Sequence, residues 1–223
     1  MRSGVQRNHL PKEFGDDASF HRTFQRWVKR GVLGRPVVGH AGQGLRGAAR
    51  RRLAVAERRL RDGQGPARGD QVGPNPTDRA KAGTKRGVPT GAGGGPVAVA
   101  LAPANRHDSL VPQDVLEAVV VEPPADARQH LCPDKAFVGG PCDATARVFD
   151  YEPHVRQIGA EKVGATGQKT YPARRWVVER TIAWLNRCRA ILIRWDKKAE
   201  NHLGMIQPAC ALLWYRRLRR LTT

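Results

Sequence analysis

The chain has 223 residues, enough for one domain of ordinary size with a buried core and a small appendage. Its formal net charge of +19 and its pI near 11.0 predict a polyanionic partner, although ribosomal and chromatin-like proteins share this balance, so charge does not select a reaction. Four cysteines without a CxxC pair or zinc-finger spacing indicate reduced thiols, and the lack of a long apolar run predicts a cytoplasmic protein without a membrane partner.

The first 34 residues are expected to form a small helical module. Asp16 or Asp17 can cap a helix over residues 18–30, and Gly31 can end it. Basic side chains lie largely outside the apolar stripe, so this helix either lies on DNA or has a solvated basic face. The stripe consists of Phe20, Phe24, Trp27 and Val28, and the basic residues are Arg22, Arg26, Lys29 and Arg30.

The segment over residues 35–69 has an aberrant composition. It is crowded with Arg, Gly and Ala, and no aromatic residue occurs between Trp27 and Phe137. Because a strand of a packed core normally carries aromatic or bulky aliphatic residues, we expect this segment to be disordered or to form an improvised helix around residues 48–61.

The remaining residues, 70–223, alternate between strand and helix patterns and predict an α/β domain with a mixed sheet flanked by helices. The glycine run over residues 91–95 is interpreted as a turn, because it lacks the Lys-Ser/Thr of a phosphate-binding loop. The predicted strands are 96–102, 129–134 and 153–158, and the predicted helices are 111–121 and 141–149.

Two helices complete the predicted domain. The stretch over residues 171–195 has a strongly periodic apolar stripe, and Glu179 lies about 200° from Val177, so its carboxylate points away from the stripe. From this helix alone, a surface Glu179 in ion pairs with Arg175 and Arg180 is favoured over a metal ligand. A final helix over residues 201–220, bent at Pro208, ends in the basic cluster Arg216, Arg217, Arg219 and Arg220.

Several motifs occur in the order found in a known family. The sequence RRWVVERTIAWLNRCR, followed by LIRWDKKAEN, resembles the carboxy-terminal signature of bacterial insertion-sequence transposases of the insertion-sequence-five family. Earlier matches to the same family are LPKEFGDDASFHRTFQRWVKRGVL, GPNPTDRAKAGTKR, ANRHD and HLCPDKAF. The resemblance implies an RNase H-like core with a DDE triad of carboxylates that cleaves and transfers DNA strands at the ends of an insertion element.

The resemblance also implies site residues. Asp134 and Glu179 match the second and third acids, and they would act as catalytic residues and ligands of Mg²⁺, with Mn²⁺ as a substitute, because hard cations take oxygen ligands. Arg175 and Arg180 would hold phosphates near the metal. Lys81, Lys85 and Arg86 are interpreted as further DNA contacts, and Asn105, Arg106, His107 and Asp108 as supports near the site.

The first acid of the triad has no match. Relatives carry it in a segment resembling VDWRWQSAD, where this chain has RRLAVAERRLRDGQGPARGD, so the first catalytic strand is predicted to be missing and this copy to be impaired. Permitted codons for residues 51–69, read one nucleotide later, give VDWRWQSADCAMVKAPLG, which reproduces the family segment. We therefore interpret residues 35–69 as frame-disrupted, with the codon of the lost aspartate straddling Arg59 and Leu60. Asp62 is a weak substitute, because its neighbours do not form a buried strand.

The sequence thus predicts three regions: a DNA-recognition module over residues 1–34, the aberrant segment over 35–69 and a partial catalytic domain over 70–223. The expected partners are double-stranded DNA, at both transposon ends and target, and a second copy of the chain on that DNA, in a bacterial cytoplasm near the nucleoid. The alternative function is that of a non-catalytic basic remnant that binds nucleic acid.

Overall fold

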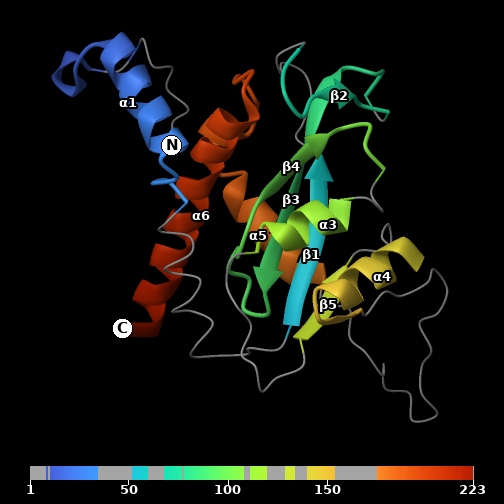
Figure 1. Cartoon of the computed structure of the whole chain (residues 1–223). Coiled ribbons are helices and arrows are strands. Elements are labelled where there is room, and N and C mark those ends of the chain that lie inside the picture. The colour runs from blue at the N-terminus through green and yellow to red at the C-terminus, as the bar shows by residue number, and fades with distance from the viewer. Residues whose placement is uncertain are drawn as a thin grey trace, which may run out of the picture.

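The computed structural model describes residues 9, 11–34, 52–59, 68–76, 78–107, 111–119, 129–133, 140–153 and 175–222 (Figure 1). The strands are β1 (Arg52–Arg59), β2 (Gly73–Pro74), β3 (Ala82–Gly91), β4 (Ala100–Pro103), β5 (Gln129–Pro133) and β6 (Tyr151–Pro153). The α-helices are α1 (Asp17–Lys29), α3 (Val111–Glu117), α4 (Gly140–Val148), α5 (Arg175–Leu185) and α6 (Ala199–Thr222), and η2 (Lys12–Phe14) and η5 (Arg189–Ile191) are short 3₁₀ helices.

The strands form one six-stranded mixed sheet in the order β2-β3-β1-β5-β6, with β4 paired to β3. Strand β1 is antiparallel to β3 and parallel to β5, and β5 is parallel to β6. Val55 of β1 is in register with Pro89 of β3 and with Pro133 of β5. The predicted mixed sheet with flanking helices is therefore confirmed.

The prediction that the first catalytic strand is missing is wrong at the level of the backbone. Residues 52–59 form β1, which lies between β3 and β5 near the centre of the sheet, and they do not form the improvised helix that the composition suggested (Figure 1). The physical reason is that β3 and β5 each present an edge of backbone donors and acceptors, and a strand between them satisfies both edges. The rest of the segment, residues 35–51 and 60–67, lies outside the described residues.

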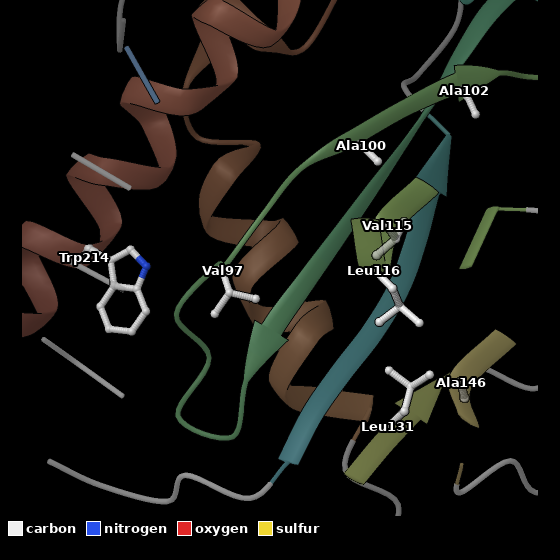
Figure 2. Close-up of a cluster of buried hydrophobic side chains, with 8 residues drawn as sticks. All are labelled: Val97, Ala100, Ala102, Val115, Leu116, Leu131, Ala146 and Trp214. Atoms are coloured by element: carbon white, nitrogen blue, oxygen red, sulfur yellow. The ribbon is translucent and has the colours of Figure 1, made fainter. Parts of the chain in front are cut away.

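The sheet is covered on both faces. On β4, Ala100 and Ala102 join Val115 and Leu116 of α3 in one buried cluster, which Figure 2 shows. The alternate residues Val99 and Leu101 join the other cluster, which contains residues from α5, η5 and α6. This second cluster includes Val88, Leu185, Cys188, Ile191, Ile206 and Cys210. Helices α3 and α5 therefore cover opposite faces, as the alternation along a strand requires.

Most predicted elements are present with shifted bounds. The regular part of the strand predicted at 96–102 is β4, whereas Pro96 forms an isolated bridge with Thr90. Of the strand predicted at 153–158, only Pro153 lies in the described residues, where it is the last residue of β6, and residues 154–158 lie outside them. The helix predicted within residues 171–195 ends at Leu185 and is followed by η5. Strand β3 was not predicted, because its sequence AGTKRGVPTG has a proline, glycines and charged residues instead of an apolar alternation.

The N-terminal helix is confirmed together with its cap. The Ser19 backbone N–H donates to Asp16 Oδ2 at 3.3 Å, and Gly31 has a φ of +64°, as expected for the residue that follows a helix end. This helix packs on α6 at Gly204, where an added Cβ would lie 2.6 Å from Val28 Cγ2. Phe20 and Trp27 of the predicted stripe remain 40% and 46% exposed, so α1 buries only part of its apolar face.

Candidate catalytic helix and DNA-binding residues

Helix α5 turns one side toward the protein and the other toward solvent. Glu179 is exposed, and so is Trp176 one turn before it. The prediction that Glu179 points away from the buried stripe is confirmed. The buried side chains are Val177, Val178, Thr181, Ile182 and Leu185.

The glycine turn between β3 and β4 lies between α5 and α6 and fixes them relative to the sheet. Thr181 Oγ1 lies 2.6 Å from the carbonyl oxygen of Gly94, and Trp214 Nε1 donates to the carbonyl oxygen of Pro96 at 2.6 Å. Gly94 has a φ of +87°, and an added Cβ on Gly95 would lie 2.1 Å from the Trp214 ring. Glycine is required here by a left-handed backbone and by a close helix, which confirms the interpretation of the run as a turn.

Asp134, the second predicted acid, directly follows strand β5 in the sequence. Strand β5 ends at Pro133, and Asp134 is the next residue, outside the described part of the chain. Helix α5 contacts β1 and β3, and β1 pairs in parallel with β5. The backbone therefore places the carboxyl ends of β1 and β5 at one edge of the sheet, whereas the separation of the two carboxylates remains a prediction.

Strand β1, where the first acid of the triad is expected, has no aspartate in its sequence. Of the eight residues of β1, only Glu57 is acidic, and it is in register with Gly87 of β3. Asp62, the weak substitute, lies outside the described residues. Asp70 is described, and its backbone N–H donates to the carbonyl oxygen of Lys197 at 3.1 Å. Within the described ranges, no three His, Cys, Asp or Glu side chains are grouped so that they could hold a metal ion.

The basic residues of the GPNPTDRAKAGTKR motif occupy two environments. Lys81 is half exposed and lies 3.6 Å from Asp78 in an ion pair. Lys85 and Arg86 are only 2% and 1% exposed. Lys85 Nζ donates to the carbonyl oxygen of Arg106 at 2.5 Å, and Arg86 Nη2 donates to Asn186 Oδ1 at 2.9 Å. A phosphate contact requires an exposed cation, so Lys85 and Arg86 are not proposed as DNA contacts.

Of the two arginines predicted to flank the metal, Arg175 is the first residue of α5, and its side chain lies outside the description. Arg180 is half-buried, and its guanidinium carbon lies 4.6 Å from the ring centroid of Trp176 and 5.0 Å from that of Trp184. Arg180 Nη2 also lies 3.4 Å from the carbonyl oxygen of Gly93. These contacts hold its charge in one position beside Glu179.

The predicted supports after β4 join neighbouring elements. Arg106 forms a two-pronged ion pair with Asp114 of α3, and its carbonyl oxygen accepts from Lys85. Asn105 packs closely on Gly73, whose added Cβ would lie 2.0 Å from Asn105 Oδ1. His107 is exposed, and Asp108 lies outside the described residues. The contacts of Arg106 and Asn105 tie β4 to α3 and β2, which is a structural role.

A buried polar cluster beneath α6 was missed by sequence analysis. Arg194 Nη1 donates to Thr84 Oγ1 at 2.8 Å and lies 3.2 Å from the carbonyl oxygen of Gln71, and Nη2 donates to that of Lys197 at 2.9 Å. His202 is 1% exposed, and burial, with the Arg194 and Arg86 charges, lowers its pKa from 6.5 to about 3. The only signal in the sequence was the RWDKKAEN motif, whose arginine could not be placed without the fold.

Comparison with known proteins identifies the family. The model of the transposase DDE domain matches residues 58–214. A curated protein of Burkholderia cepacia, named "Putative transposase for insertion sequence element IS402", is 34% identical over 157 residues, which are 67% of this chain and 71% of that protein. The chain belongs to the DDE transposase family. It is a bacterial insertion-sequence transposase by these criteria, and its mixed sheet with flanking helices is the RNase H-like DDE transposase domain.

The family match begins at residue 58, within the last two residues of β1, and it ends in α6. It includes Asp134 and Glu179. DDE transposases use divalent metal ions, and a hard cation takes about six or more oxygen ligands, several of them from protein. Of the two predicted metal ligands, the described residues include only Glu179, so they do not complete a metal site by themselves.

The structure also bears on membrane-spanning helices and on the state of the cysteines. In the described part of the chain, none of the helices has the length and apolar character to cross a lipid bilayer. All four cysteines are described, and they are reduced and outside disulfide bonds, as predicted. Burial raises the pKa of Cys142 to about 11 and that of Cys210 to about 12, so both stay protonated at neutral pH.

Proposed function

We propose that this chain is the transposase of an insertion element, which cleaves DNA strands at the element ends and joins them to target DNA with Mg²⁺ or Mn²⁺ as cofactor. The observation that carries the proposal is the exposed Glu179 on α5, a helix that packs on β1 and β3 beside the parallel strands β1 and β5. Asp134 directly follows β5, so Asp134 and Glu179 are proposed as the catalytic metal ligands.

The proposed partner is double-stranded DNA, at transposon ends and at the target. The charge of +19 supports a polyanionic partner, and the exposure of Lys81 and the partial exposure of Arg180 support contacts with phosphate groups. Arg175 belongs to the same proposed surface, as the first residue of α5. Cleavage of two element ends supports a homodimer on DNA, working in the bacterial cytoplasm at the nucleoid.

This copy is proposed to be catalytically impaired. Strand β1 restores the backbone of the first catalytic strand, but it has an arginine-rich sequence with Glu57 as its one carboxylate. Two acids orient a metal and a nucleophile less well than three, and a small misplacement costs about a hundredfold in rate. The aspartate lost in the proposed frame disruption over residues 35–69 would lie at residues 59–60, where β1 ends.

A strand-cleavage assay tests the function. The substrate is a duplex with the terminal repeat read from the locus, and the reaction contains Mg²⁺. Replacing residues 51–69 by VDWRWQSADCAMVKAPLG should raise cleavage at least about hundredfold over the natural chain. In that restored protein, Asp134→Ala and Glu179→Ala should remove cleavage, whereas the control Glu200→Gln, an exposed carboxylate on α6, should not.

Two results would overturn parts of this proposal. Specific binding of the duplex by both proteins without cleavage by either would favour the non-catalytic remnant. Efficient cleavage by the natural chain that Glu57→Gln removes would show that β1 supplies its own third carboxylate. The gene sequence across residues 35–69 tests the frame separately, since a shifted reading without the VDWRWQSAD segment contradicts it.

A further inference from the structure

Two guanidinium groups from different helices meet at the glycine turn between β3 and β4. Arg180 Nη2 of α5 lies 3.4 Å from the carbonyl oxygen of Gly93 and would lie 3.0 Å from a Cβ added to Gly94. Arg217 of α6 approaches the same turn so closely that a Cβ on Gly93 would lie 2.4 Å from its Nη2 and 3.1 Å from its Cζ. The absence of side chains at Gly93 and Gly94 therefore leaves room for both cations.

The described residues provide no acidic counter-charge for these two cations. Neither Arg180 nor Arg217 forms an ion pair with an acidic side chain in the part of the chain that the structure describes. The pKa of Arg217 is lowered, first by burial and then by the Arg180 charge. Within the described residues, Arg180 Nε is buried without a hydrogen-bond acceptor. Two partly desolvated like charges repel each other, so this arrangement costs free energy until an anion binds.

Aromatic contacts hold Arg180 in place without neutralising its charge. Its guanidinium carbon lies 4.6 Å from the ring centroid of Trp176 and 5.0 Å from that of Trp184. Arg217 lies one helical turn after Trp214, whose Nε1 donates to the carbonyl oxygen of Pro96 at the end of the glycine turn and so fixes α6 at this point. Because aromatic rings already hold the Arg180 side chain, little of its conformational entropy is lost when a ligand binds.

We propose that Arg180 and Arg217, across the Gly93–Gly94 turn, form a clamp for one phosphodiester group of bound DNA. This inference rests on the proposed function for the identity of the ligand. Guanidinium groups match the oxygens of a phosphate with paired hydrogen bonds, and the charge of the whole chain favours DNA as their source. Arg180 directly follows Glu179, so a phosphate held here positions the DNA relative to the catalytic helix.

The test compares three variants that keep most of the side-chain stem. Arg217→Gln removes one prong of the clamp, Arg217→Lys keeps the charge without the fork, and Arg216→Gln removes an equal charge from an exposed neighbour on α6. Affinity for duplex DNA is measured without metal over a series of salt concentrations. Arg217→Gln should weaken binding about tenfold and lower the slope of log K against log salt by about one. Arg217→Lys should fall between it and the natural chain.

Arg216→Gln should weaken binding by less than about threefold, as a long-range charge loss. Thermal unfolding without DNA distinguishes the clamp from a structural role. Removing a like charge should leave the unfolding temperature of Arg217→Gln unchanged or higher, whereas an arginine needed for packing would lower it. A marked drop in that temperature, or DNA binding equal to that of Arg216→Gln, overturns the clamp and leaves the proposed function standing.

Failure of the natural chain to bind any duplex would overturn the clamp and the proposed function together. A further arm uses inorganic phosphate alone. Stabilisation by phosphate that Arg217→Gln removes, with DNA affinity unaffected, would assign the site to free phosphate and overturn its assignment to DNA.

Discussion

Strand β1 and the C-terminal helices reach their places in the fold by different means. The sequence of β1, RLAVAERR, is rich in arginine and has no aromatic residue, yet the strand pairs on one side with β3 and on the other with β5. Helices α5 and α6 are instead fixed by their own side chains, such as Thr181 and Trp214 on the glycine turn. A central strand can be specified by the edges beside it, whereas a helix on a sheet depends on the pattern of its own residues.

The position of a strand in the sheet and the presence of a catalytic side chain on it therefore depend on different features of the sequence. Backbone pairing places β1 where the proposal expects the first catalytic strand, but a metal ligand is a property of one side chain. The proposed frame disruption over residues 35–69 would therefore leave the sheet in place and still remove an acid from the proposed site. The C-terminal region retains both its packing and its carboxylate, Glu179.

Arg194 joins the C-terminal region to strand β3 of the sheet, and breaking this joint should have the largest effect on stability. Arg194→Gln removes charged hydrogen bonds to Thr84 Oγ1 and to the carbonyl oxygens of Gln71 and Lys197, and it shortens a buried side chain. We expect the free energy of unfolding, measured in urea, to fall by about 3 kcal/mol. Arg189→Gln on η5 is the matched control, because Arg189 is exposed, and it should change stability by under about 0.5 kcal/mol. Equal effects of the two changes would mean that Arg194 is not the joint.

The buried His202 should make the stability of the C-terminal region depend on pH. Arg194 and Arg86 face it, and its pKa is lowered from 6.5 to about 3, so the folded state binds fewer protons than the unfolded state between these values. The contribution is fully present above pH 6.5 and is lost as the pH falls toward 3. We expect a loss of about 2 kcal/mol between pH 7 and pH 5, measured by urea unfolding.

Two variants separate His202 from the other titrating groups. His202→Gln should flatten this pH dependence between pH 7 and pH 5, where few carboxylates titrate. The exposed His9 provides the control, since His9→Gln should leave the pH dependence as it is in the natural chain. A pH profile that His202→Gln leaves unchanged would show that His202 does not remain neutral in the folded protein.

Sequence patterns predicted the fold wherever side chains specify an element. The cap at Asp16, the exposed Glu179 and the glycine turn follow from local rules, and all three are confirmed. Strands β1 and β3 were missed because their neighbours, and not their own apolar alternation, determine them. A local sequence window does not contain those neighbours.

The candidate site was predictable only in part, for a related reason. Motif position found Glu179, but it could not distinguish a buried arginine from a surface one. Arg86 and Arg194 are buried, whereas Arg180 is half-buried and lies beside Arg217 of a later helix, α6. Burial and pairing of charges depend on long-range packing, which only the fold supplies.

Replacing an alanine by valine should change the free energy of unfolding in opposite directions in β1 and in α5. Ala56→Val in β1 adds a β-branched residue to a strand with poor intrinsic preference and should stabilise the protein by up to about 1 kcal/mol. Ala183→Val at an exposed position of α5 should destabilise it by about 0.5 kcal/mol, because a β-branched residue loses χ1 freedom in a helix. Urea unfolding of both variants gives the two signs. If Ala56→Val also destabilises, the packing around β1 leaves no room for a larger residue, and the sequence of β1 specifies its place as closely as that of α5 does.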